Sequence, residues 1–68
     1  MLSEIANRLL IMTKDSDVKV KTAAALALGE GATATSEIAS RLLTMTKDSN
    51  SDVQVAAVTA LGRLYRRK

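Results

Sequence analysis

The chain has 68 residues, a formal net charge of +3 and a hydrophobic fraction of 47%. This fraction is too high for a disordered chain, and no apolar run approaches the roughly 20 residues that a membrane-spanning helix needs. The sequence contains no His and no Cys, which excludes disulfides, the commonest general base, thiol nucleophiles and most zinc sites. We therefore predict no catalytic residues, no cofactor, no metal site and no membrane partner.

Ala and Leu are abundant and Pro is absent, a composition that favours helices. A chain this short buries only roughly 60% of the surface that its unfolded form exposes, so its stability depends on good helix packing or on self-association. The N-terminus shows no basic segment followed by a long apolar stretch, as a secretory signal would. We expect a cytoplasmic protein.

The first predicted helix begins near Ser3, which we expect to cap it, and Glu4 lies in its first turn, where a carboxylate is favoured. Arg8 follows Glu4 at the spacing of an ion pair on a helix surface. The residues that recur at the spacing of one helical face are Leu2, Ile5, Ala6, Leu9, Leu10 and Thr13. The polar segment 14–17 then interrupts the pattern.

Asp17 is expected to cap a second helix. The hydrophobic face of this helix consists of Val20, Ala23, Ala24, Ala27 and Leu28. Gly29 and Gly31 are predicted to end it, since glycine adopts the left-handed conformation common just after a helix. Residues 29–33 lack the lysine and the preceding strand of a phosphate-binding loop, so we interpret them as a connection.

The second half of the chain repeats the first. The segment SEIANRLLIMTKDS at 3–16 returns as SEIASRLLTMTKDS at 36–49, and the same offset continues without a gap to Gly29 and Gly62. We call two residues related by this offset counterparts. We predict one domain, 1–68, with repeat units 1–33 and 34–68. Thr35 or Ser36 should cap the third helix and Asn50 the fourth, which should continue through Gly62 to about Arg66.

A helix pair repeated at a fixed period is typical of an α-solenoid. We predict an all-α fold of two tandem helix-turn-helix repeats that form a four-helix α-solenoid fragment. The sequence DSDVKVKTAAALALG at 15–29, matched by DSNSDVQVAAVTALG at 48–62, resembles the HEAT-repeat family, in its short-unit class that includes phycobilin lyase-like and artificial repeats. The resemblance implies a non-catalytic interaction module. That family prefers Arg, often paired with a neighbouring Asp, where Lys21 and Gln54 stand.

Two units are fewer than the roughly three that repeat proteins normally need to bury their apolar faces. Aliphatic residues replace smaller or more polar ones on the outer helices, because Ile11 aligns with Thr44 and the two valines Val55 and Val58 align with Thr22 and Ala25. The residues predicted for self-association are Ile11, Val55, Val58 and Leu64. We expect a homodimer, most simply a twofold one, as a continuous four-unit solenoid or an exchanged helix bundle, while another protein remains an alternative partner.

Basic residues suggest a contact with an anionic partner, and the candidates are Lys14, Lys47, Arg63, Arg66, Arg67 and Lys68. The alternative is a solvated helix end, where cations are favoured by the helix dipole. Nucleic-acid binding is a second functional hypothesis, weakened by the presence of only one aromatic residue, Tyr65, for base stacking. A third is a structural or engineered repeat fragment without independent function. The acidic turns 15–17 and 48–52 are interpreted as helix caps, since the glycine and glutamate of a calcium loop are missing.

Overall fold

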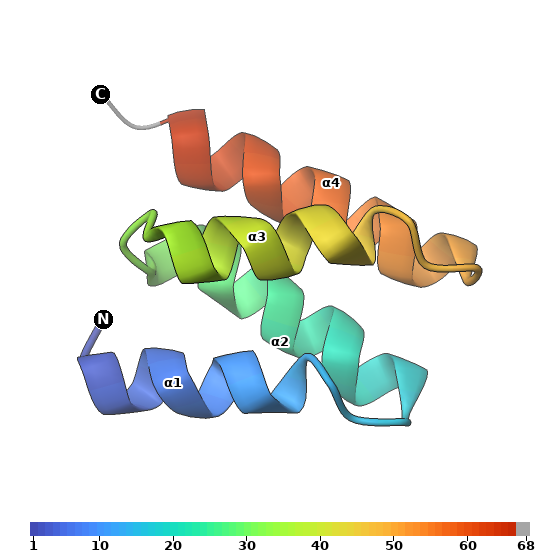
Figure 1. Ribbon diagram of the computed structural model, residues 1–68, viewed down its shortest axis with the longest axis horizontal. Coiled ribbons are helices and arrows are strands. Elements are labelled where there is room, and N and C mark those ends of the chain that lie inside the picture. The colour runs from blue at the N-terminus through green and yellow to red at the C-terminus, as the bar shows by residue number, and fades with distance from the viewer. Residues whose placement is uncertain (67–68) are drawn as a thin grey trace.

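The computed structural model describes residues 1–66, in which four helices and no strand are found. The helices are α1 (Ser3–Met12), α2 (Val18–Gly31), α3 (Ser36–Met45) and α4 (Ser51–Arg66). The predicted all-α fold of tandem helical repeats is confirmed (Figure 1). None of the helices in this part of the chain has the length and apolar character required to cross a membrane.

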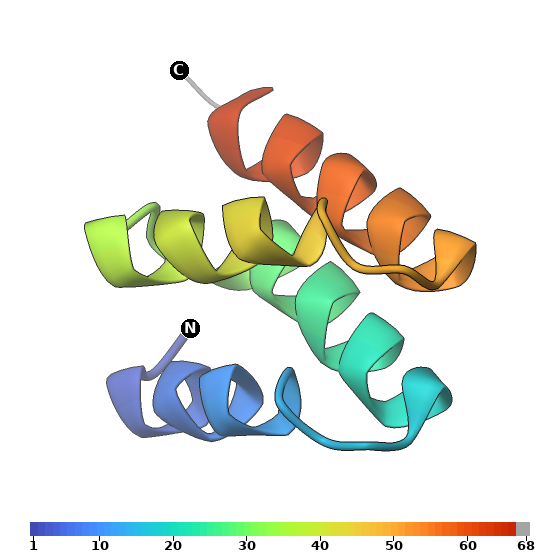
Figure 2. The same cartoon turned by 45° about the vertical axis from the view of Figure 1, so that its right-hand side comes forward.

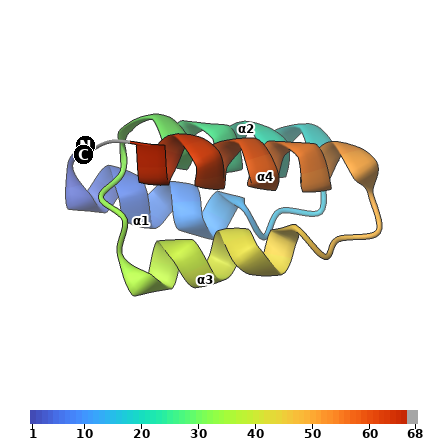
Figure 3. The same cartoon turned by 90° about the horizontal axis from the view of Figure 1, so that it is seen from above.

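The helices form two layers, one of α1 and α3 and the other of α2 and α4 (Figure 3). The closest helix packing joins α2 to α4, while α1 packs on α2 and α3 packs on α4. We call α1 and α2 the first helix pair and α3 and α4 the second helix pair. The second pair stacks on the first, so α1 and α4 lie at opposite ends of the stack (Figures 1 and 2).

Three of the four helices begin with a side-chain cap. Asp17, Thr35 and Asn50 each accept a hydrogen bond from a backbone N–H in the first turn, at 2.8, 3.2 and 2.8 Å respectively. These bonds satisfy donors that have no partner inside the helix, as predicted. The prediction for Ser3 is wrong, because Leu2 occupies the N-cap position of α1 and makes no side-chain cap bond.

The hydrophobic core lies between the two helix pairs and draws on all four helices. Its fully buried aliphatic residues are Leu28, Leu42 and Val53. Around them lie Leu10, Ala25, Ala32, Ile38, Met45, Ala56, Ala57, Ala60 and Leu64. The small alanines of α2 and α4 let the two helix axes approach closely, and the larger side chains of α1 and α3 fill the remaining space.

Gly29 lies inside α2, so its predicted role in ending this helix is wrong; the helix ends at Gly31, as predicted, but without the expected left-handed glycine. The helix continues to Gly31, and no glycine in the described residues has a positive φ. A Cβ atom on Gly29 would lie 2.6 Å from the Cα of Ala60. Glycine is therefore needed here for the contact between α2 and α4, and not for a turn.

Candidate functional site

Arg41 joins the second helix pair to the first through Thr13. Its Nε donates a hydrogen bond of 3.0 Å to Thr13 Oγ1, and its Nη2 donates one of 2.8 Å to the Thr13 carbonyl oxygen. Thr13 is fully buried, and its hydroxyl donates to the carbonyl of Leu10. Arg41 follows Glu37 at the same spacing as Arg8 follows Glu4, but no ion pair forms between them within the described residues, because the guanidinium satisfies the buried oxygens of Thr13 instead.

Two ion pairs also cross from one helix pair to the other. Lys21 Nζ on α2 lies 3.5 Å from Asp48 Oδ2 in the turn before α4. Arg63 on α4 pairs with Glu30 near the end of α2. Both pairs are partly exposed, so each adds little to stability by itself. Their value is geometric, since they mark which positions of the two repeats face each other.

The carboxyl group of Asp48 has a pKa below its ordinary value. The main cause is the backbone N–H of Asn50, which donates a hydrogen bond of 2.8 Å to Asp48 Oδ1 and so favours the charged carboxylate. Desolvation acts in the opposite direction, and the positive charge of Lys21 lowers the pKa further. The turn between α3 and α4 is thus stabilised by the ionised form of Asp48.

The Asp48→Asn variant should lose part of the acid dependence of stability. A carboxyl whose pKa is lower in the folded state than in the unfolded state stabilises the fold at pH values above its unfolded pKa of about 3.8, and this contribution disappears as the pH falls through the folded pKa. Urea unfolding between about pH 2 and pH 6 should therefore show a smaller decrease of stability on acidification in Asp48→Asn than in the wild type. Identical pH profiles would contradict this assignment.

Large hydrophobic side chains are exposed on both helix pairs. On the first pair and the two residues before it they are Met1, Leu2, Ile5 and Ile11, and on the second pair they are Leu43, Val55, Val58 and Tyr65. Ile11, Val55 and Val58 have the exposure that the self-association hypothesis requires. The hypothesis is wrong for Leu64, which is only 3% exposed because its side chain belongs to the core.

Sequence reasoning missed Leu43 and Tyr65 as exposed hydrophobic residues. Their counterparts in the first repeat are Leu10 and Ala32, which are buried. The repeat contained the signal for this surface, because a hydrophobic position that the second pair buries in the first repeat is not covered by another pair in the second repeat within residues 1–66. The comparison of aligned positions, and not the count of hydrophobic residues, identifies such a surface.

The first helix pair carries an open apolar groove at its end of the stack, which we call the α1–α2 groove. Its lining consists of Leu9, Met12, Lys19, Val20, Ala23, Ala24 and Ala27. The groove has a volume of about 440 Å³. Lys19 is the only charged residue in this lining, so the groove is suited to apolar side chains of a packed helix.

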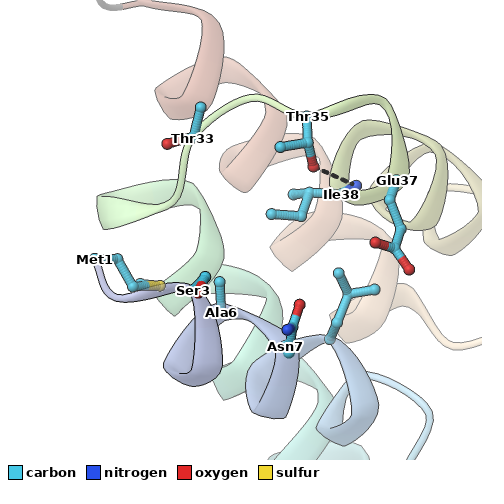
Figure 4. A pocket seen from close by; sticks show the side chains of 9 residues that line it. Met1, Ser3, Ala6, Asn7, Thr33, Thr35, Glu37 and Ile38 are labelled. Carbon is cyan, nitrogen blue, oxygen red and sulfur yellow. Dashed lines mark hydrogen bonds between the residues drawn. The ribbon is translucent and has the colours of Figure 1, made fainter.

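A smaller hollow of about 220 Å³ lies between α1 and α3 (Figure 4). Ser3 and Asn7 line it from one side, and Thr35 and Glu37 from the other. Glu37 is the only titratable side chain in its lining. The hollow can therefore offer hydrogen bonds and apolar contacts to a bound group. Within the described part of the chain, no group of three His, Cys, Asp or Glu residues is placed to hold a metal ion.

The basic residues predicted for an anionic partner do not converge. Lys14 and Lys47 are exposed in the turns after α1 and α3. Arg63 and Arg66 lie near the opposite end of α4, about 18 and 22 Å along the helix from its start at a rise of about 1.5 Å per residue. Arg63 is also engaged by Glu30. The remaining candidates, Arg67 and Lys68, lie outside the described residues.

Comparison with protein families matches residues 5–68 to the family described as HEAT repeats. The match covers both helix pairs, and it includes the residues of the Arg41–Thr13 contact and of the two ion pairs between the helix pairs. Searches of curated proteins and of solved structures each gave no match.

Proposed function

Because the chain belongs to the HEAT-repeat family, we propose that it is a protein-interaction and self-assembly module whose first partner is a second copy of itself. HEAT repeats generally mediate protein interactions or serve as scaffolds, and they are typically non-catalytic. The observation that carries the proposal is the exposure of large aliphatic side chains on both helix pairs, including Ile11, Val55 and Val58. Monomeric proteins rarely leave contiguous apolar patches in water, and their burial stabilises an assembly.

Light scattering during size exclusion, over a range of concentrations, tests self-association. The wild type should show a mass above the 7.2 kDa of one chain that rises with concentration. The Val55→Lys/Val58→Glu double variant should shift toward the monomer, since it places charges on the apolar surface of α4 without changing the net charge.

The matched control is the Ser16→Lys/Ser49→Glu variant, which makes the same charge changes at two exposed turn positions. It should associate as the wild type does. A wild type that stays monomeric at every concentration would remove the support for self-assembly.

Nucleic-acid binding has less support, because the structure separates Lys14 and Lys47 from Arg63 and Arg66 and engages Arg63 in an ion pair. The outcome that would favour it is DNA or RNA binding whose affinity falls steeply with salt, as phosphate neutralisation requires. The Lys14→Gln/Lys47→Gln variant should then reduce the salt dependence.

A further inference from the structure

We infer that two copies of this chain associate head to tail, so that the outer face of the second helix pair in one copy packs on the α1–α2 groove of the next. This inference rests on the proposed self-association and specifies its geometry. Its basis is the repeat itself, because counterparts occupy the same place in their helix pairs. A difference in exposure between two counterparts is therefore caused by the neighbouring pair.

One face of each pair is covered in the first repeat and open in the second. Leu10 is 8% exposed, whereas its counterpart Leu43 is 56% exposed. Ala25 is fully buried, whereas its counterpart Val58 is 60% exposed. These residues of the second pair, together with Thr46, Gly62 and Tyr65, form what we call the open face of α3–α4. In the first repeat the equivalent face is covered by the second pair.

The opposite face is covered in the second repeat and open in the first. The buried hydrophobic residues of the second pair are Ile38, Leu42, Met45, Val53, Ala56, Ala57, Ala60 and Leu64. Their counterparts in the first pair are Ile5, Leu9, Met12, Val20, Ala23, Ala24, Ala27 and Gly31. Six of these eight counterparts line the α1–α2 groove, all except Ile5 and Gly31, with the buried Ala24 among the six. The chain thus presents, at its two ends, the two halves of the interface that it already forms internally.

The specific contacts of the internal interface can be formed again between copies. Gly29 lies against Ala60 inside the chain; the equivalent pair is Gly62 of one copy and Ala27 of the next. Among residues 1–66, and apart from its two neighbours and the nearby backbone of its own helix, no atom lies within 4 Å of a Cβ built on Gly62. The close approach that glycine permits in the internal interface is therefore available, and unused, at the open face.

The Arg41–Thr13 contact can also be formed between copies, because the counterparts of these two residues are Arg8 in one copy and Thr46 in the other. Thr46 has the backbone conformation of Thr13, and its hydroxyl likewise donates to the carbonyl three residues earlier. Within residues 1–66, Arg8 makes no side-chain hydrogen bond or ion pair. Arg8 is exposed and thus available to donate to Thr46 of a second copy.

Charge is complementary as well. Replacing each residue of the internal Glu30–Arg63 ion pair by its counterpart places Arg63 of one copy beside Glu30 of the next, which is again an ion pair of opposite charges. The pair of Lys21 with Asp48 translates into Gln54 beside Asp15, which replaces an ion pair by a hydrogen-bonding pair. None of these translated contacts brings like charges together, so the charged side chains at these positions are compatible with the stacking.

Side-chain size differs at two positions of the open face. Val58 and Tyr65 stand where the first repeat has Ala25 and Ala32. The other side of the interface is smaller, because Gly31 stands where the second repeat has the buried Leu64. The intermolecular interface therefore keeps the arrangement of the internal one, with side chains of different size filling it.

A twofold dimer fits these faces less well. Twofold symmetry pairs each patch with the same patch of the other copy, so the open face would meet a second open face, or the α1–α2 groove a second groove. Such a dimer would also not form the contact between Arg8 and Thr46. A head-to-tail contact joins two different faces and is open-ended, so the assembly should grow with concentration beyond a dimer.

Two variants that each block one face test the geometry. Ala27→Glu places a charge in the α1–α2 groove, and Gly62→Arg places one on the open face. Each variant alone should lose about 100-fold or more in association constant, because the introduced charge would be buried without a partner. An equimolar mixture of the two should form a dimer limited to two chains, through the one unblocked face that each retains.

Sedimentation of each variant and of the mixture gives the answer, with circular dichroism melting to show that both variants fold. Gly62 has open space around it and Ala27 is partly exposed, so the fold should be kept. Variants that associate like the wild type, or that both become monomeric without recovery in the mixture, would overturn the head-to-tail geometry while leaving self-association intact. A monomeric wild type would overturn both proposals.

Discussion

Replacing Gly29 with alanine should lower the free energy of unfolding by about 1–3 kcal/mol. At most positions inside a helix the same change stabilises, by about 0.5–1 kcal/mol, because glycine loses more backbone entropy on folding. At Gly29 the new Cβ would lie 2.6 Å from Ala60 Cα and 2.8 Å from Ala60 O. These are backbone atoms, so α2 and α4 would have to separate along the closest helix contact of the fold.

Gly62 provides the matched control, since it occupies the same position in the second repeat. In the described part of the chain, no atom outside the adjoining residues and nearby backbone of α4 lies within 4 Å of a Cβ placed there, so Gly62→Ala should raise the free energy of unfolding by about 0.5–1 kcal/mol. Urea unfolding should be measured at concentrations low enough that the midpoint does not depend on concentration, because association stabilises the folded state. Shifts of the same sign in the two variants would show that helix packing does not decide the effect.

The features that the sequence predicted correctly are those set by neighbours in the chain. Asp17, Thr35 and Asn50 cap their helices because a side-chain oxygen and the backbone N–H two or three residues later are close by local geometry. The periodicity of hydrophobic residues likewise located four helices and their order. The constant offset between the two halves then indicated that two equal helix pairs would stack.

The features that the sequence did not predict depend on contacts between the pairs. Arg41 follows Glu37 at a spacing for which the local rule favours an ion pair, but the guanidinium binds Thr13 in the folded chain. The local rule for glycine likewise favours a helix end at Gly29, whereas the approach of Ala60 requires glycine there for space. In both cases a residue of the other repeat decides the role.

The candidate surface was predicted only in part for a related reason. Hydrophobic substitutions identified Ile11, Val55 and Val58, which are exposed. These substitutions did not show that Leu64 differs from the three exposed residues, because a leucine near the end of α4 is compatible with either a buried or an exposed position. Helical spacing places Leu64 on the same face as Ala57 and Ala60, and all three are buried against the first pair or α3. Burial in a repeat depends on which neighbour is present.

The Leu42→Ala variant should show the largest loss of stability, about 2–5 kcal/mol. Leu42 is fully buried in the core between the pairs, so its truncation removes apolar burial and leaves a cavity. A loss of this size is a large part of the stability of a small domain. Leu42→Met, which conserves volume, should cost less than about 1.5 kcal/mol and keeps the comparison measurable if the alanine variant unfolds.

Leu9→Ala is the matched control, because Leu9 is the counterpart of Leu42 in the first repeat. Leu9 is only partly buried and lines the open α1–α2 groove, so its truncation should cost clearly less in the free energy of unfolding of the monomer. Equal losses in Leu9→Ala and Leu42→Ala, measured by urea unfolding at low concentration, would show that the neighbouring pair does not determine the burial of this position.

The same two variants should differ in the opposite sense in association. Leu9 belongs to the face that, in the head-to-tail arrangement, receives a second copy, so Leu9→Ala should weaken self-association more than it weakens folding. Leu42→Ala removes a side chain that is fully buried within one chain. The association constant of its folded form should therefore be close to that of the wild type. One leucine position, written twice in this sequence, therefore contributes to folding in one repeat and to assembly in the other.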